Sequence, residues 1–481
     1  MTRVLENVNP KNVFKFFEDI SAIPRPSKHE DEIADYLVNF AKERNLEVIK
    51  DEFKNVIIKK AASSGYENAP GVILQGHSDM VPEKNETTEH DFLKDGLKLY
   101  VDGEFLKAKG TTLGADNGIA VAYALAILDG NYNHPKLCVV ITSDEEAGMS
   151  GARNLDLTLI EGYSNFINLD SSPEGVFTVS CAGGKTVTVK IPITHEPFKL
   201  EEYKIYEVSI SGLVGGHSGV DIHKNLANAN RLMGRLLNEI RRDCELIEIS
   251  GGMKPNAIPR ESKATIAVKG ELKISKIDKI ANIFKNEHIE NEPNLTVSCK
   301  EIDYKYDDGG WYMENGFDII STLMLLPYGV LRQTEAGTIA SNNIGVVETI
   351  NNNREVVITN AVRSSILSLR DFMQKQIEIV GGNAGGYVSA SEGYPAWEYK
   401  QDNPLRDKAL EVYKSFSGVE GLIELTHGGL ECGIFASQME GVNFIATGPN
   451  LYNLHTPDEQ LNIPSTERVF DYLIKLLEEL N

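Results

Sequence analysis

The 481-residue sequence lacks the features that mark membrane, secreted and nucleic-acid-binding proteins. No run reaches the roughly 18 apolar residues that a membrane-spanning helix needs. The first ten residues, MTRVLENVNP, lack the apolar core of a signal peptide. Lysine and arginine number 48 against 70 aspartates and glutamates, giving a net charge of −22, and no basic stripe offsets it. We therefore expect no membrane partner and no nucleic-acid partner.

Cysteine is scarce, and its positions show neither paired spacing nor a CxxC motif. Scattered cysteines of this kind are typical of reduced thiols in a cytosolic protein. We therefore expect a cytoplasmic location. The five are Cys138, Cys181, Cys244, Cys299 and Cys432.

The first part of the chain alternates between strands and helices. The segments 55–60, 71–76, 137–146 and 166–172 predict buried strands, the last two running into acids, and the alanine-rich stretch 117–128 predicts a helix. Such alternation is typical of an α/β sheet, in which functional groups gather where strands end.

Two helices are expected before the first strand. Asn9 is a suitable N-cap, with Pro10 at the first helical position. Ser27 and Glu30 have the spacing of a capping box at the start of the second helix.

The sequence pattern changes after the glycine pair of CAGGK, and alternating strands then dominate to about residue 395. The final part returns to helix, strand and helix. A chain this long needs more than one core. We therefore expect a discontinuous α/β domain, residues 1–184 and 398–481, with a second domain, residues 185–397, inserted into it.

The middle domain contains a weak internal repeat. Residues 251–270 and 339–365 each present an asparagine-bearing loop, a strand, a turn and another strand. Helices are expected near 223–243 and 317–326. This repeat favours a duplication within the domain.

His77 and Asp79 lie two positions apart at the end of the predicted strand VILQG. Alternate residues of a strand point to the same side. Such a pair can supply a metal-binding nitrogen and the carboxylate that fixes the tautomer of the same ring. Taken alone, a chance occurrence is the ordinary explanation.

Five further residues have an ordinary and a functional interpretation. Asp116, in the glycine-rich GTTLGADNGIA, suits a helix N-cap or a carboxylate shared by two cations. Glu145 and Glu146 form either a solvated acidic turn or a cluster of acids in which bound cations relieve the charge repulsion. Asp170 caps a turn, and His455 is a surface loop histidine, unless they join the same cluster.

Together these residues supply two histidines and several carboxylates at loop ends. This is the ligand set expected for Zn²⁺, with Mn²⁺ or Co²⁺ as alternatives. The groups suffice for two metal ions bridged by one acid, with one carboxylate left over as a general base.

Six motifs, in this order, resemble those of the M20 metallopeptidases: GHSDMVPE, GTTLGADNGIAVA, ITSDEEAGMSGA, NLDSSPEG, GGHSGVDI and GPNLYNLHTPDEQL. FEDISAIPRPSKHEDEIADYL and HGGLECGIF are similar to the branch of aminoacyl-histidine dipeptidases, also called Xaa-His or cytosol non-specific dipeptidases. The likeness runs from about residue 17 to the C-terminus.

The resemblance implies a catalytic domain with a mixed β-sheet flanked by helices, and an inserted α+β lid that closes over the substrate. It also implies a dinuclear site with Asp116 as the bridge. His77 and Asp170 would hold one metal ion, and Glu146 and His455 the other.

The remaining roles also follow from the resemblance. Asp79 would orient His77, and Glu145 would be the general base and acid. In the lid, His217 would support the oxyanion; without the resemblance, a flexible turn with a surface imidazole is the favoured interpretation. Asn256 and Arg363 would hold the substrate's carboxylate, for which the guanidinium fork is well suited.

The resulting expectation is a metal-dependent dipeptidase acting on small unblocked peptides, with an Xaa-His preference implied by the resemblance alone. The alternatives are another M20 amidohydrolase, such as a tripeptidase or an aminoacylase, and a non-catalytic peptide-binding protein. A homodimer is one expectation for its assembly. The other is that the duplicated lid supplies contacts that shorter-lid relatives obtain from a partner subunit.

Overall fold

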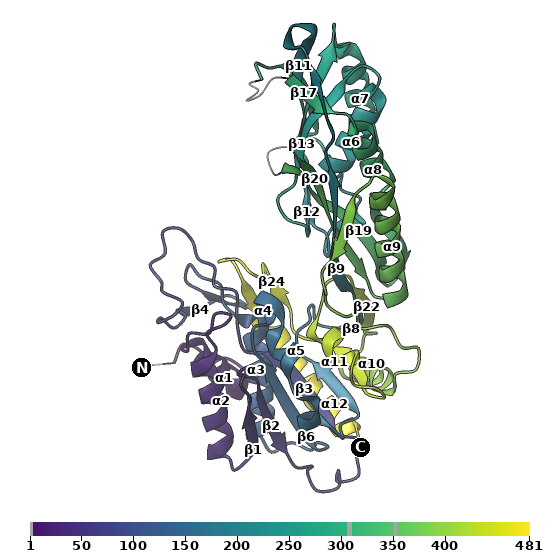
Figure 1. Cartoon of the computed structure of the whole chain (residues 1–481). Helices are drawn as coiled ribbons and strands as arrows, with labels where there is room; N and C mark the ends of the chain where they lie inside the picture. Colours follow the sequence, from purple (N-terminus) through teal and green to yellow (C-terminus); the bar gives the residue numbers. More distant parts are fainter. Residues whose placement is uncertain (1–2, 305–309, 351–353) are drawn as a thin grey trace. The chain divides into compact units, whose positions relative to one another are not determined.

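The computed structural model describes residues 3–304, 310–350 and 354–481, which fold into two compact units (Figure 1). Among these residues, no helix is both long enough and apolar enough to cross a membrane. Unit 1 consists of Met1–Ser180, Tyr399–Glu424 and Leu430–Asn481, and unit 2 of Cys181–Glu398 and Leu425–Gly429.

The fold class predicted from the sequence is confirmed: a discontinuous α/β domain with a mixed sheet carries an inserted α+β domain. We keep the division into residues 1–184, 185–397 and 398–481 as a prediction, because it assigns roles as well as boundaries. The contacts add one detail to it. Residues 425–429 belong to unit 2, where Leu425 N donates to Ala336 O and Ala182 N to Thr426 O.

Unit 1 is built on an eight-stranded sheet, counted within the described residues, in the order β1-β2-β6-β3-β7-β23-β8-β22. Strands β6, β3, β7 and β23 run parallel, so their carboxyl ends share one edge. Every residue of β3 and β6 is buried, as expected for strands covered on both faces. The strands are β1 Glu47–Lys50, β2 Val56–Lys60, β3 Val72–His77, β6 Leu137–Thr142, β7 Asn165–Asn168, β8 Val176–Cys181, β22 Leu422–Thr426 and β23 Asn443–Ala446.

A smaller sheet, in the order β24-β25-β5-β4, completes the strands of unit 1. Its strands are β4 Leu99–Asp102, β5 Phe105–Ala108, β24 Leu451–Tyr452 and β25 Gln460–Asn462. The helices are α1 Lys11–Ser21, α2 Asp31–Glu43, α3 Ala115–Asp129, α4 Glu145–Gly148, α5 Ser150–Asn154, α10 Pro404–Ser417, α11 Glu431–Ala436 and α12 Ile463–Glu479, with a 3₁₀ turn at Leu157–Ile160.

The helix starts expected at the N-terminus are wrong by a few residues. Helix α1 begins at Lys11, and Pro10 itself is its N-cap. Helix α2 begins at Asp31, and no side chain caps it. Glu30 Oε1 instead accepts from the amides of Lys28 and Asp144, so one local and one tertiary hydrogen bond replace the capping box.

Unit 2 contains one large sheet in the order β16-β11-β15-β13-β19-β20-β9-β21, with β18 paired to β19. Helices α6, α7, α8 and α9 run along one side of it (Figure 1). They are α6 Ala229–Ile240, α7 Ile274–Glu287, α8 Gly316–Leu325 and α9 Leu367–Asn383, with 3₁₀ turns at Leu200–Glu202 and Ile222–Lys224. The strands are β9 Gly183–Pro192, β11 Tyr203–Ser211, β13 Glu245–Gly251, β15 Ser262–Lys269, β16 Thr296–Glu301, β18 Gly329–Thr334, β19 Gly337–Ile350, β20 Glu355–Ser364 and β21 Tyr387–Ala390. Two short ribbons pair β10 His195–Phe198 with β17 Gly310–Met313, and β12 Gly216–His217 with β14 Ala257–Ile258.

The large sheet consists of two halves with the same topology. One half runs β11-α6-β13-β15-α7-β16 and the other β9-α8-β19-β20-α9-β21, and both have the strand order 4-1-3-2. They join antiparallel where β13 meets β19. The predicted duplication therefore appears in the topology. Its detail differs, because Asn342 and Asn343 lie inside β19 rather than in a loop, and residues 351–353, between β19 and β20, lie outside the described residues.

Candidate active site

The seven residues predicted to form the metal site come together in unit 1. His77 ends β3, Asp170 follows β7, and Glu145 and Glu146 begin α4 just after β6. Their strands are parallel neighbours, so these side chains gather at the same edge of the sheet. Asp116 arrives from the first turn of α3 and His455 from the loop between β24 and β25. Asp79 lies two residues beyond β3.

Asp116 lies between the two histidines. Its Oδ1 is 3.3 Å from His77 Nε2, and its Oδ2 is 3.2 Å from His455 Nε2. Asp170 Oδ1 lies 3.8 Å from His77 Nε2, and Glu146 Oε1 lies 3.0 Å from His455 Nε2. One carboxylate thus faces two separate ligand groups, which is the arrangement that a bridging ligand requires.

These side chains suit divalent cations. The ligand atoms form three groups within 4.8 Å: His77, Asp116 and Asp170; His77, Glu145 and Glu146; and Asp116, Glu146 and His455. Glu146 Oε1 is buried and makes no hydrogen bond despite its closeness to His455. A buried acceptor without a donor is unfavourable unless something positive meets it. Imidazole nitrogens and carboxylate oxygens are ligands of Zn²⁺, Mn²⁺ and Co²⁺.

The acids of the cluster repel one another. Burial raises the pKa of Glu145 to about 8, and the charges of Glu431 and Glu146 add to the rise. Burial, followed by the charge of Asp116, raises the pKa of Asp170 well above its usual value. The cluster therefore favours positive charge at its centre.

In this structure the imidazoles of His77 and His455 supply that positive charge. Burial disfavours a charged His77 ring, but Asp170, Asp116 and Asp79 outweigh it and raise the pKa of His77. The nearby carboxylates of Asp116 and Glu146 raise the pKa of His455 to about 10. A divalent cation would satisfy the same carboxylates.

Asp79 has more partners than the sequence indicated. Its Oδ1 lies 3.3 Å from His77 Nδ1, the position that would orient the ring. The amides of Glu145 and Glu146 donate to its two oxygens at 3.0 and 3.2 Å. The hydroxyl of Ser27 donates to Oδ2 at 2.8 Å. This completely buried carboxylate thus fixes both a histidine and the backbone of the acidic turn.

Sequence reasoning missed several residues behind the site. Asn117 Oδ1 accepts from His77 N, and its Nδ2 donates to Leu169 O, so it joins two of the strand ends. Glu431 accepts from Thr142 Oγ1 at 2.7 Å, and burial raises its pKa to about 7. Glu431 lies in the motif HGGLECGIF, which was noted only as a likeness; that motif was the available signal.

Unit 2 brings together the three residues expected to bind substrate. The pairing of β12 with β14 places Asn256 beside His217, with 3.4 Å between Asn256 Nδ2 and His217 Nε2. Arg363, on β20, approaches them at Gly219: a Cβ there would lie 3.0 Å from both Arg363 Cζ and His217 Cε1. Because Gly219 has no side chain, the guanidinium of Arg363 and the imidazole of His217 can both lie close to it.

The histidine of this cluster is suited to donate a hydrogen bond. Burial, followed by the charge of Arg363, lowers the pKa of His217. Its Nδ1 accepts from the amide of Gly219 at 3.2 Å, and the proton of the neutral ring lies on Nε2 when the Asn256 amide turns its oxygen, not its Nδ2, toward that nitrogen.

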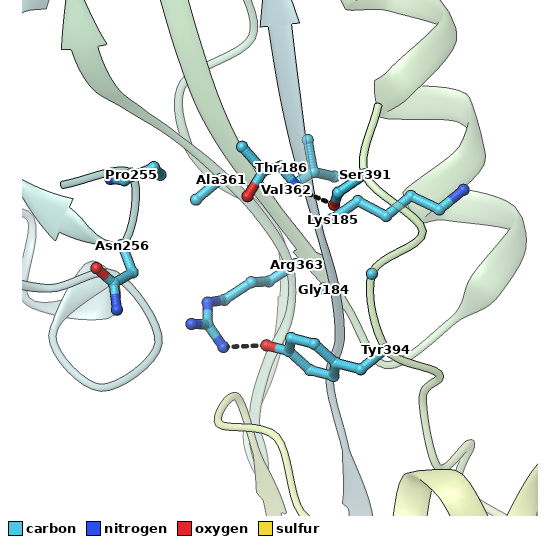
Figure 2. Close-up of a pocket in the computed structure, with 11 residues that line it drawn as sticks. Gly184, Lys185, Thr186, Pro255, Asn256, Ala361, Val362, Arg363, Ser391 and Tyr394 are labelled. Atoms are coloured by element: carbon cyan, nitrogen blue, oxygen red, sulfur yellow. Dashed lines mark hydrogen bonds between the residues drawn. The ribbon is translucent and has the colours of Figure 1, made fainter. Parts of the chain in front are cut away.

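Arg363 borders a cavity of about 330 Å³ (Figure 2). Its Nη1 donates to the hydroxyl of Tyr394 at 2.6 Å, while its Nε is buried without a hydrogen-bond partner. Lys185 also lines the cavity, but its side chain points away from Arg363 in Figure 2 and bonds Gln374. An arginine with unused donors in a cavity can take a carboxylate.

His427 is a further residue of unit 2 that the sequence analysis did not single out. It lies 2.7 Å from the hydroxyl of Ser341 through Nε2 and 3.1 Å from Thr338 O through Nδ1. Burial, followed by the charge of Arg363, lowers its pKa to about 4, so the ring is neutral near pH 7.

The chain is similar to peptidases over nearly its whole length. It is 38% identical over 488 aligned positions to the cytosol non-specific dipeptidase of Escherichia coli K12, covering 99% of each chain. The crystal structure of an aminoacylhistidine dipeptidase from Vibrio alginolyticus superimposes with a TM-score of 0.91 at 35% identity, covering 99% of this chain and 98% of the other.

More distant structures share the fold. A tripeptidase from Staphylococcus aureus Mu50 matches with a TM-score of 0.60 at 15% identity, covering 98% of this chain and 99% of its own. The family model described as peptidase family M20/M25/M40 matches residues 73–479, which contain all seven residues of the unit 1 cluster. With this match and the full-length dipeptidase relative, the chain belongs to peptidase family M20/M25/M40.

Proposed function

We propose that this peptidase is a dinuclear, metal-dependent dipeptidase that hydrolyses unblocked dipeptides in the cytoplasm. The observation that carries the proposal is Asp116, whose two oxygens face His77 and His455 separately at 3.3 and 3.2 Å. The names of the two similar proteins, both dipeptidases, support the substrate class. In this proposal unit 1 is the catalytic domain and unit 2 is the lid.

The proposed metal ligands divide around Asp116. His77 and Asp170 would hold one ion, and Glu146 and His455 the other, with Asp116 common to both. Zn²⁺ is our first choice for its preference for nitrogen and oxygen ligands, with Co²⁺ or Mn²⁺ as alternatives. When bound, such ions lower the pKa of water and polarise a carbonyl group.

Glu145 is the proposed general base and acid. It is a buried carboxyl group beside His77 and Glu146 that the assignment leaves outside the metal ligands. It takes a proton from the attacking water and passes one to the leaving amine. A glutamate performs both transfers best when its environment raises its pKa toward neutrality.

Residues of unit 2 are proposed to bind the substrate. Arg363 and Asn256 hold the peptide's terminal carboxylate, and the N–H at His217 Nε2 supports the developing oxyanion. We expect a requirement for a free carboxylate because Arg363 borders the cavity and its guanidinium fork suits that group. The Xaa-His preference rests on the similarity to an aminoacylhistidine dipeptidase.

The test combines metal analysis with hydrolysis. We expect about two divalent ions per chain, loss of dipeptide hydrolysis after chelation, and recovery when metal is returned. A metal-free protein that cleaves at full rate would contradict the mechanism. A panel of dipeptides, tripeptides and N-acyl amino acids separates a dipeptidase from a tripeptidase or an aminoacylase, and peptide binding without cleavage would indicate the non-catalytic alternative.

The assembly of the protein is tested separately. Its mass in solution distinguishes a monomer from a homodimer. Measured with the activity of His217→Ala, it shows whether the loss follows the chain's own histidine or accompanies a change in assembly.

A further inference from the structure

The turn that presents Asp116 is bound by two charged side chains outside the proposed ligand set. This turn, Leu113–Asp116, lies between the small sheet of unit 1 and helix α3 and includes the first two residues of that helix. Glu459 contacts its amides, and Arg25 contacts one of its carbonyl groups. Neither was singled out by the sequence, and the mechanism proposed above does not use them.

Glu459 receives all four amides of the turn. Its Oε2 accepts from Leu113 N at 2.7 Å and Gly114 N at 2.9 Å. Its Oε1 accepts from Ala115 N at 2.9 Å and Asp116 N at 3.2 Å. The side chain is only 3% exposed, so water cannot replace these bonds. With both oxygens engaged by backbone donors, Glu459 holds the turn in place and is not itself placed as a metal ligand.

Arg25 binds the turn through a carbonyl group and links it to the neighbouring loop. Its Nη2 donates to Gly114 O at 2.6 Å. Its Nη1 donates to Ser78 O at 3.0 Å and Asp79 O at 3.2 Å, in the loop that directly follows His77. The side chain is buried. One guanidinium therefore sets the distance between the Asp116 turn and the loop that follows His77.

Glu459 links the Asp116 turn to the loop that carries His455. It lies four residues after His455 in a loop that is closed by its own hydrogen bonds. Glu459 N donates to Thr456 O at 3.0 Å, and Thr456 Oγ1 donates to Asn453 O at 2.8 Å. A displacement of the Glu459 carboxylate therefore moves the Asp116 turn relative to His455.

We propose that Glu459 and Arg25 are positioning residues that hold Asp116 between the two metal positions, with Glu459 setting its distance from His455 and Arg25 its distance from His77. The inference rests on the dinuclear site proposed above. It assigns the two ends of the bridge to two different supports, so loss of each support weakens a different metal position.

The experiment titrates metal-free protein with CoCl₂, followed by calorimetry and by the visible absorption of bound Co²⁺. In Glu459→Gln an amide N–H₂ replaces one acceptor and faces two backbone donors. We expect the ion at Asp116, Glu146 and His455 to bind about 10- to 100-fold more weakly, the range found when a residue behind a metal ligand is replaced. The ion at His77, Asp116 and Asp170 should lose less, and kcat should fall more than KM rises.

Asp458→Asn is the matched control, because it removes the same charge from the exposed neighbour of Glu459. It should leave both binding steps and the Co²⁺ spectrum unchanged. Arg25→Lys keeps the charge and loses the fork, and it should weaken the His77 position more than the His455 position. This second variant decides the matter if Glu459→Gln does not fold, as judged by circular dichroism.

Two outcomes overturn the inference while leaving the dinuclear site intact. In one, folded Glu459→Gln binds both Co²⁺ ions as the wild type does. In the other, Asp458→Asn loses as much affinity as Glu459→Gln. A wild-type protein that binds fewer than two Co²⁺ ions overturns the proposed function itself, and the inference with it.

Discussion

The two candidate sites of this chain are built in opposite ways. In unit 1, His77 and Asp79 are buried, the other four acids are partly buried and His455 is exposed, and side chains from elsewhere in the unit fix the loops that carry them. In unit 2, Arg363, Asn256 and His217 are only partly supported, and Arg363 keeps an unpaired Nε. In the proposed assignment, the groups given to the chemistry are therefore held by many hydrogen bonds, whereas Arg363, given to the substrate, keeps a donor without a partner.

The largest expected effect comes from Glu145→Gln, which tests whether unit 1 carries the chemistry. The amide cannot exchange the proton, so kcat should fall by about 10²- to 10⁴-fold, the contribution typical of general acid–base catalysis. Metal content should remain, because Glu145 is not among the proposed ligands. Steady-state kinetics and elemental analysis measure the two quantities.

The exposed Glu161→Gln is the control for this change, since it alters charge on the surface of the same unit. It should leave kcat unchanged. A Glu145→Gln protein that keeps its metal and its turnover would show that the base lies elsewhere and would remove the functional contrast between the two units.

Arg363→Lys is expected to have the next largest effect, and on KM rather than on kcat. Lysine cannot reproduce the guanidinium fork. A hydrogen bond to a charged group contributes about 1.5–3 kcal/mol, so KM should rise by roughly 10- to 100-fold. The preference for a dipeptide over its C-terminal amide should shrink in parallel.

Lys185→Gln is the control for Arg363→Lys, because Lys185 lines the same cavity but points away from Arg363. It should keep the wild-type KM. A drop in kcat with unchanged KM in Arg363→Lys would assign Arg363 to the chemistry and break the comparison.

The comparison also explains what the sequence could reveal. His77 and Asp170 were predictable because each lies at or just after the end of a fully buried strand, and parallel strands bring such ends together. Arg363 has no such local mark: it lies within β20, and only the resemblance pointed to it. Glu459 and Ser27 were missed because their partners lie 343 to 346 and 52 positions away, which no local pattern encodes.

Tyr394→Phe tests how loosely Arg363 is held. The variant removes the hydroxyl that accepts from Nη1 and retains the aromatic ring. We expect KM to rise by roughly tenfold at most, near the lower end of the about 1.5–3 kcal/mol for a bond to a charged group, because Arg363 keeps its own donors. Tyr399→Phe removes a similar bond, at 3.0 Å from Arg406 Nη1 in unit 1, and should not change KM. An equal rise in both variants would indicate a general loss of stability instead of a positioning role.

The smallest effect is expected for Gly219→Ala, which narrows the space between Arg363 and His217. The new Cβ would lie 3.0 Å from Arg363 Cζ and Nη1, so the guanidinium must shift by a few tenths of an ångström. A loosely held arginine can make that shift, and KM should rise only a few-fold, whereas a rigid site would lose most of its activity. Gly382→Ala in α9 is the control, since a Cβ there meets nothing within 4 Å. That control should keep KM and gain up to about 1 kcal/mol of stability from helix propensity, measurable by thermal unfolding. A loss of activity in Gly219→Ala as large as that in Glu145→Gln would mean that the unit 2 cluster is as tightly fixed as the acids of unit 1.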